Sequence, residues 1–185
     1  MKGTILKQTY ATLIGIALLT AGCSSKTKPT DENFMKGLND YYAGHNDCLF
    51  PNALNFPYQV DPGPHAKEDK QRMDALTDSG LMKRTEDRNY HVNVYQLTAL
   101  GERVAGRFCY GHRQVTSMDS FTPPEKVKGM LQTHVTYHYK MMDVPVWAKT
   151  DEMLKAFPDL AKALSGEATG ETAMANAGVG WQVPG

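Results

Sequence analysis

The sequence predicts an α+β fold, with N-terminal helices and a hairpin, then an antiparallel sheet, then a C-terminal helix packed on that sheet. Three observations support this class. Apolar residues recur at helical spacing in residues 33–43 and 65–79. Residues 127–142 alternate apolar and polar side chains, as a half-buried antiparallel strand does. Residues 147–165 carry one apolar stripe that ends at Gly166, which is typical of a helix.

The first two helices are short and amphipathic. Residues 33–43 form the first, and residues 65–79 form the second, which is expected to turn Met73 and Leu76 inward. Gly80 follows directly and favours an end of the helix at that point.

Two long strands and a broken helix are expected in the second half. Residues 108–121 form the strand before 127–142, but they alternate poorly, so the pattern leaves their register open. In the helical segment 147–165, Thr150 is a suitable N-cap. Pro158 lies inside the apolar stripe and is expected to kink or split the helix.

Residues 75–101 resemble the end of a winged-helix domain. They read as a helix, a Gly-Leu turn at residues 80–81, a two-stranded wing with its tip at residues 87–89, and a Leu-Thr pair before Gly101. DNA-binding winged helices carry several basic residues on the recognition helix. The corresponding helix here mixes lysine and arginine with aspartate and glutamate. The resemblance therefore implies a shape without DNA binding.

The first 22 residues have the parts of an export signal. Lys2 and Lys7 supply positive charge, and residues 11–19 form a short apolar run. This run is too short to span a bilayer, which takes roughly 20 apolar residues. Residues 1–22 are therefore expected to be a signal peptide.

The end of this segment resembles the lipobox of bacterial lipoproteins. Ala21, Gly22 and Cys23 match its small residues and its cysteine, whereas Thr20 departs from the usual leucine. The resemblance implies cleavage between Gly22 and Cys23 and acylation of Cys23 with chains such as palmitate. Ser24, where aspartate favours inner-membrane retention, implies the outer membrane. Two or more acyl chains give stable anchoring.

The mature chain divides into three parts on composition. Residues 23–32 are polar and lack periodicity, which is typical of a lipidated N-terminus and flexible tether. Residues 33–166 are expected to form a single periplasmic α+β domain, and residues 167–185 a tail or an edge strand. Segments 108–111 and 144–158 resemble proteobacterial lipoproteins without an assigned activity.

The charge balance argues against a nucleic-acid partner. The whole chain has 20 basic and 20 acidic residues. Removal of Lys2 and Lys7 with the signal leaves 18 basic against 20 acidic residues, so no basic excess remains to neutralise phosphates.

The remaining two cysteines are expected to form a disulfide. In an oxidising compartment an even pair is more often a disulfide than a metal or catalytic site. Cys48 and Cys109 would close a loop of about 62 residues. The pairing would stabilise the fold by about 4 kcal/mol in the chain-entropy model.

The sequence contains none of the common catalytic or metal-binding motifs. His134 and His138 share a strand face about 13 Å apart, too far for one metal ion. His45 and Cys48 form a weak nucleophile pair, with which the disulfide competes. The tyrosines are more often core or strand residues than a recognition surface, although they suit both. No cofactor and no metal are expected.

The sequence favours a non-catalytic accessory or binding module, anchored in the outer membrane through acylated Cys23 and facing the periplasm, with an envelope protein or peptidoglycan as partner. A small periplasmic hydrolase and a surface-exposed antigenic lipoprotein remain alternatives. A hydrolase requires a concave pocket where a histidine converges with a carboxylate. The pairs to inspect join one of His45, His65 and His112 to Asp119 or Asp143. A binding module requires an exposed apolar or aromatic patch instead.

Overall fold

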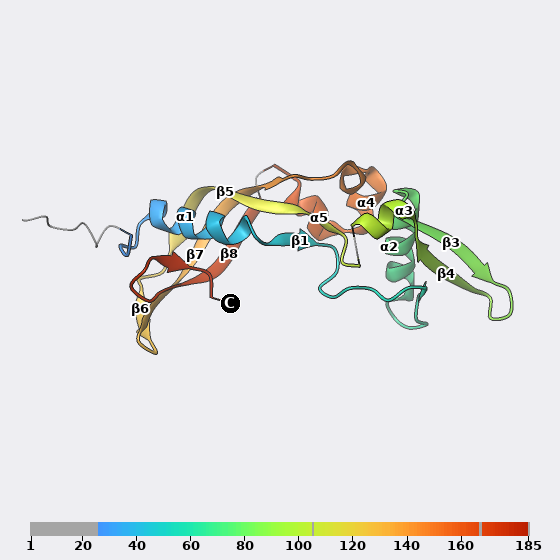
Figure 1. Cartoon of the computed structure of the whole chain (residues 1–185), viewed down its shortest axis with the longest axis horizontal. Helices are drawn as coiled ribbons and strands as arrows, with labels where there is room; N and C mark the ends of the chain where they lie inside the picture. Colours follow the sequence, from blue (N-terminus) through green and yellow to red (C-terminus); the bar gives the residue numbers. More distant parts are fainter. Residues whose placement is uncertain (1–25, 105, 167, 185) are drawn as a thin grey trace, which may run out of the picture.

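The computed structural model describes residues 26–184, apart from residues 105 and 167. The expected signal peptide and Cys23 lie outside the described residues. The molecule is elongated, with a large antiparallel sheet at one end and a smaller sheet with helices at the other (Figure 1). This arrangement confirms the predicted α+β class.

The large lobe consists of helix α1 and a six-stranded sheet. The strand order is β1-β5-β7-β8-β9, and β6 pairs with β7 outside this path. The bounds are α1 Asp31–Tyr42, β1 Asn46–Cys48, β5 Cys109–Phe121, β6 Glu125–Val127, β7 Met130–Met142, β8 Ala168–Asn176 and β9 Trp181–Gln182. Every pairing is antiparallel.

The small lobe combines a three-stranded sheet, in the order β2-β4-β3, with helices that arrive from two parts of the chain. Its first elements are β2 Tyr58–Gln59, α2 Ala66–Asp78, β3 Met82–Asp87, β4 Val92–Leu97 and α3 Ala99–Arg103. Between β7 and β8 the chain adds η1 Val146–Lys149, α4 Asp151–Ala156 and α5 Pro158–Ala163. Helix α4 packs on α2, which joins the two parts.

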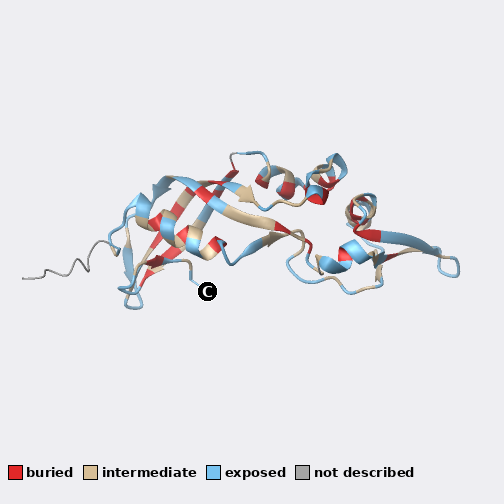
Figure 2. Cartoon of the chain, turned by 45° about the horizontal axis from the view of Figure 1, so that its top comes forward, coloured by how far each residue is buried: buried red, intermediate tan, exposed pale blue. Residues whose placement is uncertain are grey.

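The buried residues form two hydrophobic clusters (Figure 2). One cluster packs α1 against the large sheet, with Phe34 and Leu38 on Val135 and Met174. The other packs α2, the small sheet and the helices between β7 and β8, and includes Phe108 from the connection between the lobes. Each cluster removes apolar surface from water and thereby stabilises its own lobe.

The predicted helices and strands are largely present. Residues 33–43 and 65–79 correspond to α1 and α2, and Met73 and Leu76 are buried as expected. Thr150 accepts a hydrogen bond from the Met153 amide and caps α4, which confirms its predicted role.

The strand predictions need two refinements. The poor alternation of β5 has a physical cause, because its pairing with β7 shifts register twice, between Val115 and Ser117 and between Met118 and Ser120. The strand predicted over residues 127–142 starts with a turn. Lys128 and Gly129 both have positive φ and connect β6 to β7 in a two-residue hairpin.

The helical segment divides at Pro158, as predicted, and a further strand follows it. Pro158 is the first residue of α5, and the helical segment divides there into α4 and α5. Residues 167–185, expected as a tail or edge strand, contain β8, which pairs on both sides, and the edge strand β9.

The N-terminal segment lies against the far end of the large sheet. Asn176 donates from Nδ2 to the carbonyl oxygen of Thr27, and the Trp181 indole donates to the carbonyl of Lys28. Helix α1 then begins at Asp31, with Thr30 as its N-cap. The expected tether of residues 23–32 therefore meets the folded lobe at Thr27.

A side chain closes part of the outer edge of β5. The Asn39 carbonyl oxygen accepts from the Val115 amide at 2.8 Å, and its Nδ2 donates to the Val115 carbonyl at 3.4 Å. The side chain thus satisfies the same backbone groups that a neighbouring strand would.

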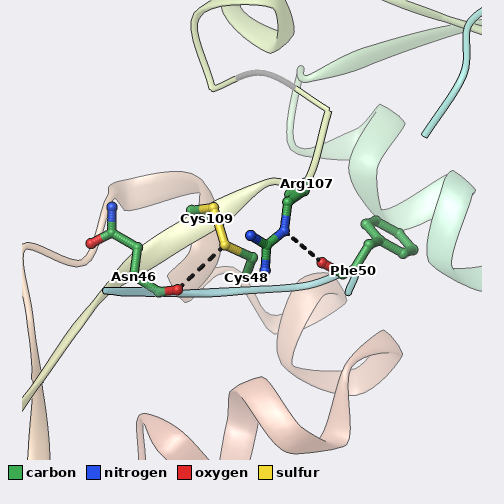
Figure 3. The surroundings of a disulfide bond; sticks show 5 residues. All are labelled: Asn46, Cys48, Phe50, Arg107 and Cys109. Atoms are coloured by element: carbon green, nitrogen blue, oxygen red, sulfur yellow. Dashed lines mark hydrogen bonds between the residues drawn. A yellow bond between two sulfur atoms is a disulfide. The ribbon is translucent and has the colours of Figure 1, made fainter. Parts of the chain in front are cut away.

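The Cys48–Cys109 disulfide is present, as predicted, where the chain passes between the lobes. The two cysteines are partners across β1 and β5. Beyond them, Phe50 and Arg107 exchange backbone and side-chain hydrogen bonds, so the two connecting segments lie side by side (Figure 3). The Cys48 sulfur also lies 3.5 Å from the Asn46 carbonyl oxygen. This approach is a contact and not a hydrogen bond, because a disulfide sulfur carries no proton to donate.

Candidate functional site

A polar cavity of the large lobe lies between the sheet and α5. It has a volume of about 440 Å³ and is open to solvent. Strands β1, β5, β7 and β8 and helix α5 all contribute to it. The side chains that give it its chemistry are Asp47, Tyr110, Arg113, Tyr139, Asp159, Lys162 and Glu171. We call this cavity the arginine–tyrosine cleft.

Arg113 is the centre of the cleft. Its Nε donates to Asp47 Oδ2 at 2.8 Å, and the two side chains are 27% and 19% exposed. Its guanidinium also lies 5.3 Å from the Tyr42 ring centroid and 4.7 Å from the Tyr139 ring centroid. These cation–π contacts and the ion pair hold the guanidinium in one place.

Small residues and hydroxyl groups position the aromatic walls. Gly170 on β8 faces Tyr137 on β7, and a Cβ at Gly170 would lie 2.6 Å from the Tyr137 ring. The glycine therefore gives this ring its space. The Tyr137 hydroxyl meets the Tyr42 hydroxyl and accepts from Arg113 Nη1 at 3.4 Å. A hydrogen-bonded network thus links α1, β5 and β7.

The pKa values of Tyr110, Arg113 and Tyr139 are all raised above their ordinary values. Burial raises the pKa of Tyr110 to about 12, and the negative charge of Asp47 contributes. Burial also raises the pKa of Tyr139, although Arg113 opposes it. Burial alone would lower the pKa of Arg113, but the hydrogen bond and charge of Asp47 outweigh it and raise the pKa. At neutral pH the tyrosines therefore carry their protons and Arg113 is charged.

The cleft offers hydrogen-bonding groups and fixed charges to a ligand. A neutral phenol donates and accepts hydrogen bonds, but it is a poor base or nucleophile. Cys48 is held in the disulfide, and the described residues lining the cleft include no histidine. The arrangement offers a fixed cation, rigid aromatic rings and mixed charges to a polar ligand.

Of the two residues of the predicted disulfide, Cys48 contributes to the lining of this cleft and is bonded to Cys109. The other predicted site residues, Gly22 and Cys23, lie outside the described residues. Lipidation and signal cleavage therefore stay predictions.

The histidines of the hydrolase hypothesis do not converge in the cleft. His45 stacks on Tyr41, with ring centroids 3.9 Å apart, and the side chain of His65 is 80% exposed. His112 does meet a carboxylate named in that hypothesis, with Nδ1 at 3.5 Å from Asp143 Oδ2. The Asp143 side chain is 81% exposed, so this pair lies at the surface rather than in a concave pocket.

His134 and His138 both lie on β7, where the sequence placed them. Within the described part of the chain, no three His, Cys, Asp or Glu side chains lie close enough together to hold a metal ion. Over the same residues, no helix is both long and apolar enough to cross a membrane.

Sequence reasoning missed Arg113 and its cleft. The arginine lies in a strand with two register shifts, so its facing could not be read from alternation. The one available signal was the concentration of tyrosines, and Tyr42, Tyr110, Tyr137 and Tyr139 are indeed buried in or beside the cleft. Comparison with protein-family models, with curated proteins and with solved structures gave no match to this chain.

Proposed function

We propose that this chain is a lipid-anchored envelope protein that acts as a non-catalytic binding module, and that the arginine–tyrosine cleft is its ligand site. Acylated Cys23 would hold it to the outer membrane, facing the periplasm. The observation that carries the binding role is Arg113, fixed by Asp47 and two tyrosine rings at the floor of an open polar cavity.

The charges of the cleft favour a ligand with both kinds of charged group. Asp47, Asp159 and Glu171 oppose Arg113 and Lys162, so the lining is mixed and close to balance. The hydroxyl of Tyr139 adds a neutral donor and acceptor. A purely anionic ligand would face acidic repulsion, whereas a zwitterionic ligand would not. Among components of the bacterial envelope, the peptide stems of peptidoglycan carry ammonium, carboxylate and amide groups together.

The test uses the full-length acylated protein in detergent micelles. Co-sedimentation with purified peptidoglycan and calorimetric titration with soluble muropeptides measure binding. Replacing the exposed pair Lys162→Gln and Glu171→Gln removes two charged partners from the rim without touching Arg113. A single lost charged hydrogen bond costs about 1.5–3 kcal/mol, so we expect affinity to fall about tenfold or more.

A matched pair controls for general charge effects. Glu152→Gln and Lys155→Gln remove the same charges from α4, where both residues are exposed and line a different cavity. This variant should bind like the unchanged protein. Equal binding by both variants, or no sedimentation with peptidoglycan at all, would refute the assignment of this ligand to the cleft.

A small envelope hydrolase is the second candidate, and the His112–Asp143 pair is the observation that favours it. A hydrolase that uses this pair loses activity on replacement of His112 by alanine. A screen of the purified protein for amidase, esterase and glycosidase activity, repeated with this variant, decides between the two candidates.

We propose that residues 75–101 have a winged-helix-like shape but do not bind DNA. Helix α2 carries Lys70 and Arg72, but both are paired with carboxylates, namely Asp74, Glu68 and Asp69. Such pairing leaves little basic charge for a phosphate backbone. A surface-exposed orientation remains the third alternative, and protease accessibility of intact cells distinguishes it from the periplasmic one.

A further inference from the structure

One end of the large lobe gathers exposed apolar side chains around the start of the described chain. The valine and leucine residues in question are Val127, Leu131 and Val179, whose exposed fractions are 38%, 39% and 71%. Val127 and Leu131 lie on the β6–β7 hairpin, and Val179 lies in the turn between β8 and β9. We call residues 26–28, 126–131 and 177–180 together the basal face.

Contacts within the structure bring these three segments together. Leu131 is the partner of Asn176 across β7 and β8, and Asn176 donates to the carbonyl of Thr27. Lys26 and Val179 line one cavity beside α1. In Figure 1, β6 and the start of the described chain both lie at the left end, and the β3–β4 hairpin lies at the opposite end.

The basal face is also basic. Residues 26–28 and 126–131 contain Lys26, Lys28, Lys126 and Lys128 and no acidic residue. The nearest acidic side chains in sequence are Glu125 and the first turn of α1, Asp31 and Glu32. Single exposed apolar residues are ordinary on a protein surface. In the β6–β7 pairing Val127 lies opposite Met130 and Lys126 lies opposite Leu131, so Val127 and Leu131 are on the two faces of the hairpin, with Glu125 on the side of Val127. Exposed apolar residues with lysines beside them in sequence, whose long stems reach past apolar groups to polar heads, are typical of a segment that enters a lipid interface.

The chain that precedes this face supplies the second argument. Residues 1–25 enter the structure here, at Lys26, and Cys23 lies only three residues earlier. Three extended residues span about 11 Å at most. An acyl anchor on Cys23, which is part of the proposed function, would therefore hold Lys26 close to the lipid headgroups.

We propose that the basal face meets an anionic lipid surface end-on, with the β6–β7 hairpin entering the headgroup region so that Val127 on one of its faces, Leu131 on the other and Val179 lie there, and the four lysines lie beside lipid phosphates. The long axis of the molecule then points away from the bilayer. The β3–β4 hairpin lies farthest from the membrane, and the arginine–tyrosine cleft lies between the two ends. This orientation rests on the proposed lipid anchor but concerns a surface that the anchor alone does not determine.

The experiment uses the full acylated chain reconstituted into vesicles rich in phosphatidylglycerol. Val127→Trp places a fluorophore on the basal face, and Val146→Trp places one at a residue that is 83% exposed elsewhere. Brominated lipids quench tryptophan near the bilayer, and each variant is read against the background of Trp147 and Trp181. We expect strong quenching of the tryptophan at residue 127 and background quenching at residue 146.

Two further conditions test the contribution of the lysines. In 1 M salt the Debye length falls to about 3 Å, so quenching at residue 127 should drop toward background. Adding Lys126→Gln and Lys128→Gln removes two lysines that each contribute about 1 kcal/mol at an anionic surface. The ratio of docked to undocked molecules should fall about thirtyfold. Lys67→Gln with Lys155→Gln, both exposed residues of the helices in the small lobe, is the matched control and should change nothing.

The outcomes separate this inference from the anchor. Vesicle flotation measures anchoring, whereas quenching measures orientation. Protein that floats with vesicles but shows equal quenching at residues 127 and 146 would overturn the basal-face proposal and leave the anchor intact. Quenching that persists in phosphatidylcholine alone or with both lysines removed would overturn the role of charge. Concentration-dependent protein dimers that bury residue 127 would assign the face to a second copy, and failure to float would overturn both proposals.

Discussion

Removal of the disulfide should cost this protein a large share of its stability. Replacing both Cys48 and Cys109 by alanine opens a loop whose ends are 61 residues apart in sequence. The loop-closure entropy of a chain this long corresponds to about 4 kcal/mol at 25 °C. Typical domains have a free energy of unfolding of 5–15 kcal/mol. We therefore expect the double variant to fold marginally, because its unfolded state gains the freedom that the bond had removed.

Urea unfolding followed by circular dichroism measures this loss. The midpoint should fall, and the slope should rise because the unlinked chain exposes more surface when it unfolds. A reductant should destabilise the unchanged protein and leave the double variant unaffected, which controls for effects of the alanines themselves. A loss below about 1 kcal/mol would refute the entropic reasoning, because it would mean that the unfolded chain keeps the two segments together without the bond.

Three further predictions concern the large sheet. Gly170→Ala should lower the free energy of unfolding by about 1–3 kcal/mol through overpacking against Tyr137; Tyr137→Leu is itself destabilising, but the double variant should lose less than the sum of the two single losses in the same urea assay. Asn39→Ala should cost about 1–3 kcal/mol because the amide and carbonyl of Val115 lose their partner, whereas a change at exposed Lys36 should stay within about 0.5 kcal/mol. Tyr110 has a folded pKa of about 12 against an ordinary 10.0, so its contribution to stability is complete below pH 10 and is lost as pH rises toward 12. Unfolding midpoints of the unchanged protein should therefore fall over this range more than those of Tyr110→Phe, and parallel curves would contradict the shift.

Helix and strand patterns with an undisturbed period were predictable from the sequence. Helix α2 buries Met73 and Leu76 at helical spacing, and Pro158 divides the last helices because a proline cannot continue the hydrogen-bond ladder. Strand β7 alternates cleanly because one face packs on α1 and the other faces solvent.

Strand β8 was not predictable from composition. Residues 168–176 are mostly small, which resembles a flexible tail when read alone. The small residues are required by neighbours that are distant in sequence, since Gly170 makes room for the Tyr137 ring and Ala168 pairs opposite Tyr139. The cleft was hidden for the same reason. Its arginine, its carboxylate and its tyrosines come from three separate strands, β1, β5 and β7, and only the sheet register brings them together.

The Asn39 side chain on the edge of β5 has a consequence for encounters between copies of the protein. Anchored proteins diffuse in two dimensions and meet one another often, so an open strand edge invites pairing between neighbouring copies. Asn39 occupies the hydrogen-bonding groups of Val115 in the middle of that edge. A strand from a second copy would have to displace it before it could align along β5. One amide thus makes a contact within the molecule and also opposes edge-to-edge pairing at this point of β5.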